Sequence, residues 1–245
     1  MARIVDEAEH RAKREAILDF AAELVRTKGY ERMTVQDVLD GIGISRGAFY
    51  HYFDSKESLL DGLVGRMGSD AVETLLPIVR DPRLTALQKF HRHVEASSRL
   101  KASRPELIIG VLRTWYSDEN ILLRRKLTDA VLNYTAPLIL EPIIRQGIAE
   151  KTFDTPYPQL AARIIVGISL SMVDSTVGLL FSDDPDQSVA QRVREVMDAY
   201  TDSTERILGA PPGSLRNEQV DQLLSVSLRT RVAQLARQGR TDDTR

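Results

Sequence analysis

Residues 34–53 read TVQDVLDGIGISRGAFYHYF, and the order of residue types in this stretch decides the fold. Thr34 is a typical helix N-cap, and Asp37 follows it at the spacing of a capping box, so a helix is expected to begin after Thr34. The glycine-containing run at 41–44 ends that helix, and Ser45 supplies the N-cap of another. Two short helices joined by a glycine turn have the outline of a helix-turn-helix unit.

The second of these helices has the three features that insertion into the major groove of DNA requires. Gly47 and Ala48 are short, so the backbone can come close to a duplex. Phe49 and Phe53 form an i, i+4 apolar pair that holds the helix onto the protein. The hydrogen-bond donors on the same stretch are Ser45, Arg46, Tyr50, His51 and Tyr52. Free N–H groups at the helix N-termini add further partners for phosphate.

Helical periodicity dominates the remaining sequence, and we find no alternating strand pattern and no internal repeat. Before the motif, one apolar stripe predicts a helix that ends near Gly29. After it, a helix that begins after Ser55 is expected to stop around Pro77, and Pro82 is expected to open the next helix.

Further along the chain, the helical pattern from residue 120 to 149 contains Pro137 and Pro142, so it should kink. Two long helices are expected at about 157–181 and 188–208. The prolines and glycines of residues 209–213 break the pattern, and one more helix and a polar, disordered end are expected after them. The chain is therefore expected to be all-α.

Composition sets limits on the chemistry of the chain. Of 245 residues, 42% are hydrophobic and 28% charged, which is ordinary for a globular protein, and the absence of cysteine excludes disulfides and thiolate catalysis. The acidic N-terminus does not read as an export signal, so we expect a cytoplasmic protein. Residues 164–181 are apolar but contain Asp174, several serines and two glycines, which argues against a membrane span.

The sequence offers no organised metal, cofactor or catalytic site. His91 and His93 are two residues apart and diverge on a helix, so they do not form a metal-binding pair. The glycines of residues 41–47 lack the preceding strand that a dinucleotide loop needs. No nucleophile elbow and no phosphate-binding Gly-Lys-Ser/Thr motif occurs. We therefore expect no metal, no cofactor and no enzymatic activity.

Residues from about 12 to 60 closely resemble the DNA-binding domain of TetR/AcrR-type repressors. The resemblance lies in Gly29-Tyr30, in residues 33–38, in residues 43–53 and in the run SKESLL at 55–60. Leu39 and Ile42 depart from it, because such proteins usually carry alanines there. Beyond residue 60 the chain is similar only in plan, with variable helices followed by two long ones.

This resemblance implies a homodimeric transcriptional regulator, a repressor that a small molecule releases from its double-stranded DNA operator. The two helices at 157–181 and 188–208 would pair across the dimer. Positions matching backbone contacts are Thr34, Ser45, Tyr50 and Lys56, and positions matching base contacts or their surroundings are Arg46, Gly47, Ala48 and His51. Arg46 is the candidate for reading guanine, because its guanidinium fits the O6 and N7 acceptors.

The expected organisation is a three-helix DNA-binding domain at 1–55, a larger helical ligand-binding and dimerisation domain at 56–209, and a C-terminal extension at 210–245. Aromatic and charged candidates for the effector site are Arg113, Trp115, Tyr116, Tyr134 and Asp174. For Asp174, a hydrogen bond to a serine or tyrosine at the dimer seam is the alternative. A helical protein-interaction module, or an enzyme built on the C-terminal domain, are the alternative functions. The effector, the operator, and the choice between repression and activation stay open.

Overall fold

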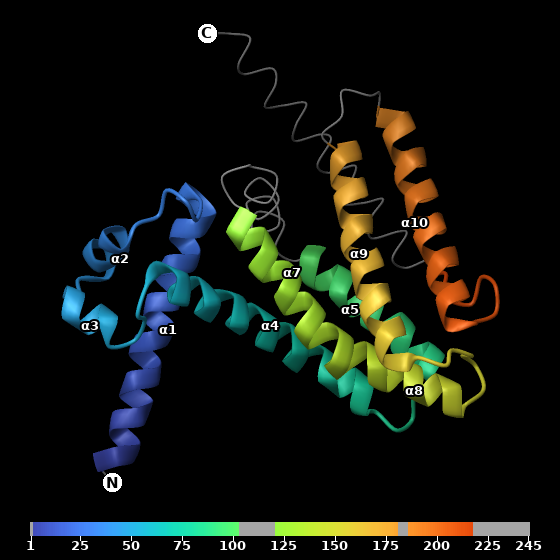
Figure 1. The fold of residues 1–245 in the computed structure, drawn as a ribbon, viewed down its shortest axis with the longest axis horizontal. Helices are drawn as coiled ribbons and strands as arrows, with labels where there is room; N and C mark the ends of the chain where they lie inside the picture. The colour runs from blue at the N-terminus through green and yellow to red at the C-terminus, as the bar shows by residue number, and fades with distance from the viewer. Residues whose placement is uncertain (1, 103–120, 181–185, 218–245) are drawn as a thin grey trace. The chain divides into compact units, whose positions relative to one another are not determined.

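The computed structural model describes residues 2–102, 121–180 and 186–217, and within them every regular element is a helix (Figure 1). The all-α fold expected from the sequence is therefore confirmed. The chain forms two compact units. The first holds residues up to 70 together with 121–130, and the second holds the rest of the described chain. The elements in chain order are α1 (Ala2–Lys28), α2 (Val35–Ile42), α3 (Arg46–Tyr50), α4 (Lys56–Arg80), α5 (Ala86–Ala102), α7 (Ile121–Thr135), a π-helical turn (Ala136–Leu140), α8 (Glu141–Ala149), α9 (Pro158–Leu180) and α10 (Asp186–Leu208).

The first unit is built around one apolar core that α1, α2, α3 and the start of α4 share. Phe49 and Leu18 are fully buried in it, and Ile17, Val38 and Leu59 pack around them. Burial of side chains of this size is the main source of stability for such a small assembly. The core therefore fixes the two short helices of the motif against α1.

Two glycines determine how the helices of this unit end and approach each other. Gly43 ends α2 in the left-handed conformation, with φ of 68°, and its N–H donates to the carbonyl of Leu39. Gly41 lies directly on the ring of Phe20, so a Cβ there would collide with that ring. The bulkier Leu39 is accommodated in the core at 5% exposure, while the missing side chain at Gly41 permits the close approach of α2 to α1.

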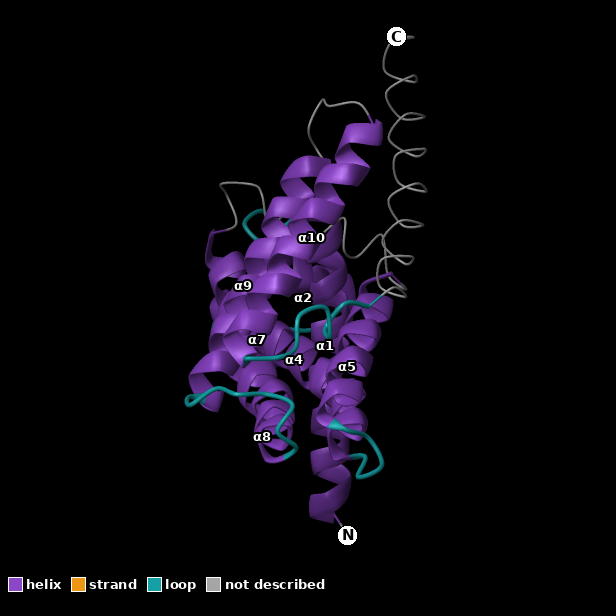
Figure 2. Ribbon diagram, turned by 90° about the vertical axis from the view of Figure 1, so that its right-hand side faces the viewer, coloured by secondary structure: helices purple, strands orange, loops and turns teal. Residues whose placement is uncertain are grey.

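The second unit has its own core, in which α9 and α10 pack side by side (Figure 2). Its most buried side chains come from segments far apart in the sequence, namely Ala86, Ile139, Ile143, Ala162 and Leu208. A polar cluster around the buried Lys89 joins α4, α5 and α8. The ammonium of Lys89 donates to Val79 O at 2.6 Å and to Gln146 Oε1 at 2.7 Å, and Gln146 donates to Glu150. These bonds satisfy a charge that would otherwise be costly to bury.

Two expectations about prolines, that Pro77 ends a helix and that Pro82 opens one, are wrong. The helix expected to stop around Pro77 continues to Arg80, because Leu75 and its neighbours hold that turn in the core. Pro82 does not open a helix. It lies in a turn in which the Asp81 carboxylate accepts from Arg83 N, and α5 begins only at Ala86. The Thr85 and Gln88 side chains form the N-terminal cap of α5, with Thr85 N donating to Gln88 Oε1.

At Pro137 the helical chain passes through the π-helical turn, and Pro142 lies in the first turn of α8, so the kink expected at these prolines stays a prediction. Proline removes one backbone donor, and a wider turn accommodates the loss.

Among the described residues, no helix combines the length and apolarity needed to cross a bilayer. The helix expected beyond Pro212 falls mainly outside the described residues. The functional boundaries expected at residues 55 and 209 stay predictions.

Candidate nucleic-acid interface

The N-terminus of α2 is held by a complete capping box. Asp37 N donates to the Thr34 hydroxyl at 3.1 Å, while Thr34 N and its hydroxyl donate to Asp37 Oδ2 at 2.7 and 2.8 Å. Lys28 adds an ion pair to the same oxygen at 2.7 Å. The Lys28 hydrogen bond, followed by those from Thr34, lowers the pKa of Asp37 to about 2. The Thr34 hydroxyl already donates its proton to Asp37. A phosphate at the N-terminus of α2 would therefore be bound first by the backbone N–H groups of the first turn.

The turn between α2 and α3 presents the start of the second helix in a fixed direction. After Gly43, the chain passes through Ile44 to Ser45, whose side chain accepts from Ala48 N at 3.2 Å. This N-cap confirms the helix start expected from the sequence, and α3 follows as Arg46–Tyr50. The left-handed Gly43 and the Ser45 cap together fix the direction of α3 within a turn of three residues.

The two faces of α3 separate core from surface as the sequence pattern predicted. Phe49 has no exposed surface and Phe53 has 3%, whereas the adjacent Tyr50 is 45% exposed and His51 is exposed as well. Gly47 lies on the outer side, and a Cβ placed there would meet nothing within 4 Å. The outer face is thus a polar surface with open space above it, which suits close approach of another molecule.

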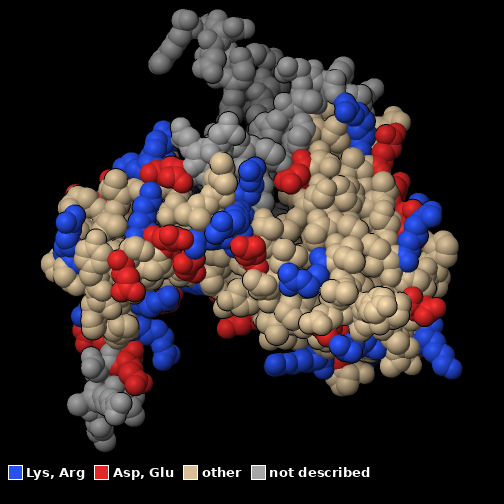
Figure 3. All heavy atoms as spheres, viewed as in Figure 1, with Lys and Arg blue, Asp and Glu red and all other residues tan. Residues whose placement is uncertain are grey.

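Arg46 is exposed in the first turn of α3 and makes no hydrogen bond or ion pair with the described residues. Its five donors are therefore available for an acceptor outside the chain. Figure 3 shows basic and acidic side chains interspersed over the visible surface of the first unit, with no broad basic patch. The hydrogen-bond donors that could contact DNA are therefore confined to α3 and its immediate surroundings.

Lys56, the other expected phosphate contact, is partly engaged within the protein. Its ammonium donates to Glu31 O at 3.0 Å and lies 4.3 Å from the centroid of the Tyr30 ring. An ammonium has three donors, so at least one is left for a phosphate oxygen. These contacts hold the start of α4 against the loop between α1 and α2, close to the Thr34 cap in sequence. Lys56 thus has a structural role that the sequence did not reveal.

The effector candidates are not assembled into one site by the described residues. Arg113, Trp115 and Tyr116 lie outside those residues. Tyr134 is half-buried on α7, and Asp174 is exposed on α9. One turn away from Asp174, the hydroxyl of Ser171 is hydrogen-bonded to Tyr200 at 2.8 Å. Their role in ligand binding stays a prediction.

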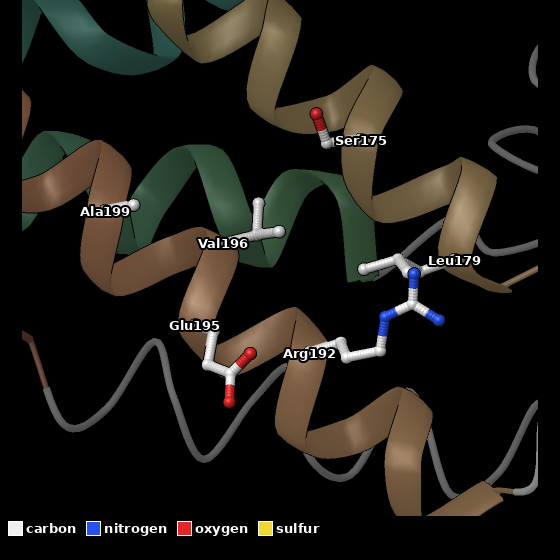
Figure 4. Close-up of a pocket in the computed structure, with 6 residues that line it drawn as sticks. All are labelled: Ser175, Leu179, Arg192, Glu195, Val196 and Ala199. Carbon is white, nitrogen blue, oxygen red and sulfur yellow. The ribbon is translucent and has the colours of Figure 1, made fainter.

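A hollow of about 420 Å³ opens between α9 and α10 in the second unit. Figure 4 shows Arg192 of α10 reaching toward Leu179 of α9 at one end of it. Neither Tyr134 nor Asp174 lines this hollow, whose other residues are Ser175, Glu195, Val196 and Ala199. Mixed polar and apolar side chains of this kind give no specific chemistry. In the described residues, no group of three or more His, Cys, Asp or Glu side chains could hold a metal ion.

Two features of the first unit escaped the sequence reasoning, because each joins residues far apart in the chain. The ring of His10 on α1 lies against His51 and Tyr52 at the end of the motif. Lys126 on α7 pairs with Asp61 at 2.5 Å and with Glu57 at 3.1 Å on α4. No local periodicity or capping signal indicates such contacts, which only the tertiary fold creates.

Comparison with known proteins places the motif in a family. A family model described as "Bacterial regulatory proteins, tetR family" matches residues 17–63, which contain α2, α3 and parts of α1 and α4. The HTH-type transcriptional repressor KstR2 of Rhodococcus jostii is 44% identical over 52 residues, or 21% of this chain and 26% of KstR2. The repressor AcnR of Corynebacterium diphtheriae is 33% identical over 136 residues, or 53% of this chain and 66% of AcnR.

The KstR2 match covers only about a quarter of that relative, so sequence similarity is concentrated in part of its length. Among solved structures, SmeT, the repressor of a Stenotrophomonas maltophilia efflux pump, aligns with a TM-score of 0.57 at 20% identity, over 83% of this chain and 96% of SmeT. A complex of SmeT with triclosan aligns over 84% of this chain and 98% of the SmeT chain, with a TM-score of 0.56 at 17% identity. These two likenesses concern the fold. Residues 17–63 therefore carry the N-terminal domain of the tetR family of bacterial regulatory proteins.

Proposed function

We propose that this protein is a ligand-responsive DNA-binding transcriptional regulator, a repressor that leaves its operator when a small molecule binds. The observation that carries the proposal is the polar outer face of α3, where Arg46 is free, Tyr50 is exposed and Gly47 leaves open space. An amphipathic helix of this kind, held on a core by Phe49, can enter a major groove with its N-terminus first. Contacts to phosphate fix its position, and contacts to base edges supply specificity.

The regulator acts as a homodimer that pairs α9 and α10 of its two subunits. Three large apolar side chains, one just before α9 and two in its first turns, support this assignment, because Tyr157, Leu160 and Ile164 are 66, 55 and 52% exposed. They follow one another at helical spacing and would be buried against a second copy. A dimer presents two recognition helices to half-sites about 34 Å apart, one turn of DNA.

A ligand releases such a dimer only if it binds better to a conformation in which the two helices are wrongly spaced. The connection for this change is α4, a single helix that contributes residues to both compact units. SmeT, whose fold is similar, forms a complex with triclosan, which supports the binding of a small molecule here. The candidates for the lining of its site are Arg113, Trp115, Tyr116, Tyr134 and Asp174.

The proposal includes a cytoplasmic location and no enzymatic activity, since regulators of this family act on DNA. The two other functions consistent with a helical chain are a protein-interaction module and an enzyme. Neither accounts for a free arginine on a short, capped helix with an open glycine beside it. Turnover of a small molecule, or tight binding to a protein with no binding to DNA, would favour one of them.

The test is a gel-shift titration of the full chain against the duplex upstream of its own gene, with a scrambled duplex of equal length as control. We expect one retarded complex containing two subunits, tighter on the upstream duplex than on the scrambled one. A panel of apolar and carboxylate-bearing metabolites is then added to the complex, and the effector is the one that dissociates it. Equal binding to both duplexes, or no binding at low salt, would contradict the proposal.

A further inference from the structure

Three aromatic rings from distant parts of the chain meet beside the recognition helix. The His10 ring on α1 lies 5.4 Å from the His51 ring, edge to face, and 4.6 Å from the Tyr52 ring, measured between centroids. His51 and Tyr52 are themselves 5.4 Å apart. His51 follows His10 by 41 positions in the sequence, so this cluster exists only because α1 passes the C-terminal end of α3.

The cluster is open to solvent on the side of α3 that faces outward. His10 and His51 are both exposed, and the exposed Tyr50 precedes His51 directly. His51 is one of the positions expected to face DNA, and a ring in direct contact with it belongs to the same surface. The first turns of α1 thereby extend the polar face of α3 beyond the helix-turn-helix itself.

Among the side chains that the structure describes, no acid forms an ion pair or hydrogen bond with His10 or His51. On α1, Glu7 lies one turn before His10, and Lys13 and Arg14 lie one turn after it. Lys13 is paired with Glu9 at 2.6 Å, and the Arg14 guanidinium lies over the Phe53 ring at 5.1 Å. From the other side, the groups in ring contact with His10 are the phenol of Tyr52 and the imidazole of His51.

A phosphate of bound DNA favours the protonated form of an imidazole beside it, because a nearby negative charge stabilises the positive one. Imidazole is also the side chain whose charge ordinarily changes between about pH 5 and 8. DNA binding would then take up protons, and by linkage its affinity rises as the pH falls.

We infer that His10 is a DNA-backbone contact and that the His10–His51 pair makes the DNA affinity of this protein increase with acidity. The inference rests on the proposed function and adds to it a contact residue on α1 and a proton-linked control of operator binding. His10 acts together with His51, so removing either imidazole lowers the number of protons taken up. Tyr52 is a positioning residue that holds the His10 ring in place.

The experiment measures the dissociation constant of the full-length protein for the duplex upstream of its gene between pH 8.0 and 6.0, at constant ionic strength. Fluorescence anisotropy of the labelled duplex gives the constant. One proton taken up changes affinity by up to about tenfold per pH unit. For the wild type we expect an overall gain of about tenfold, and for His10→Gln about threefold or less. His93→Gln, which removes an imidazole from α5 in the second unit, should keep the wild-type gain.

The outcomes separate this inference from the proposed function. No binding at any pH would contradict the proposed function itself, whereas binding with the same pH dependence in wild type and His10→Gln would overturn only the inference. A second measurement on the unmodified protein covers the case of a misfolded variant. In ¹H NMR titrations, the His10 ring resonance should titrate at higher pH with DNA bound than without it, and an unchanged midpoint would also overturn the inference.

Discussion

The two compact units differ in how far apart in the sequence the residues that specify their structure lie. In the first unit, caps, turn glycines and the buried and exposed faces of α3 all fall within residues 34–53, so neighbouring residues specify both structure and surface. In the second unit, the core draws Ala86, Ile139, Ala162 and Leu208 together from across the chain. Local signals therefore reveal the chemistry of the first unit, while that of the second depends on long-range packing.

The largest change in stability should come from mutating the buried face of α3, and mutating its exposed face should affect DNA binding instead. Phe49→Ala removes a ring with no exposed surface, and we expect a loss of about 3–5 kcal/mol in the free energy of unfolding. Tyr50→Ala, one residue later but 45% exposed, should change stability by only about 0.5 kcal/mol and weaken DNA binding instead. Chemical denaturation and gel shift measure the two quantities. A strongly destabilised Tyr50→Ala would show that this side chain belongs to the core.

The same contrast can be drawn in the second unit, where an exposed apolar side chain marks the proposed dimer interface. Ile164→Glu places a charge at a position that is 52% exposed in one subunit, so the subunit should still fold. At the interface the charge would be desolvated without a partner, which should cost about 2 kcal/mol, or roughly 30-fold in dimer dissociation. Analytical ultracentrifugation compares it with Arg163→Glu, an exposed neighbour that already carries a charge. Equal dimer stability in all three proteins would place the interface elsewhere.

Within the first unit, two basic residues should affect DNA binding in different ways. Arg46→Ala should reduce discrimination at one base pair by about 1–3 kcal/mol, because a bidentate contact to guanine is lost. Lys56→Met should weaken binding to all duplexes and reduce the salt slope by about 0.9 per phosphate contact. Methionine keeps an apolar stem over Tyr30 while removing the ammonium. Binding curves on single-base operator variants at several salt concentrations distinguish the two, and an equal loss for Arg46→Ala on every duplex would reassign Arg46 to the backbone.

These contrasts also explain what the sequence could predict. The capped starts of α2 and α3, the burial of Phe49 and the exposure of Tyr50 follow from neighbouring residues, and the structure confirms them. The continuation of α4 through Pro77 could not be predicted, because contacts with a distant core outweigh one lost backbone hydrogen bond. The His10 contact has the same origin in tertiary structure. The roles of the expected DNA contacts and effector residues stay predictions, since they depend on molecules outside the chain.

The smallest expected effect distinguishes the caps of the two motif helices. Thr34→Ala and Ser45→Ala each remove an N-cap, and each should cost about 1 kcal/mol at neutral pH. Only the cap of α2 includes a carboxylate, Asp37, whose pKa in the folded state is lowered to about 2 from an ordinary 3.8. A carboxylate with a depressed pKa stabilises the fold above its unfolded pKa, and this contribution is lost as the pH falls through the folded value.

The melting temperature of Asp37→Asn should therefore lie below that of the wild type at pH 6, and the gap should close as the pH is lowered from about 4 toward 2. Ser45→Ala is the matched control, since its cap is a neutral hydroxyl and its cost should not change over the same range. Thermal unfolding by circular dichroism, over the acid range in which the protein stays folded, gives both curves. Parallel curves for the two variants would mean that Asp37 supports α2 only as a neutral hydrogen-bond acceptor, and that the ion pair with Lys28 contributes nothing to the stability of the motif.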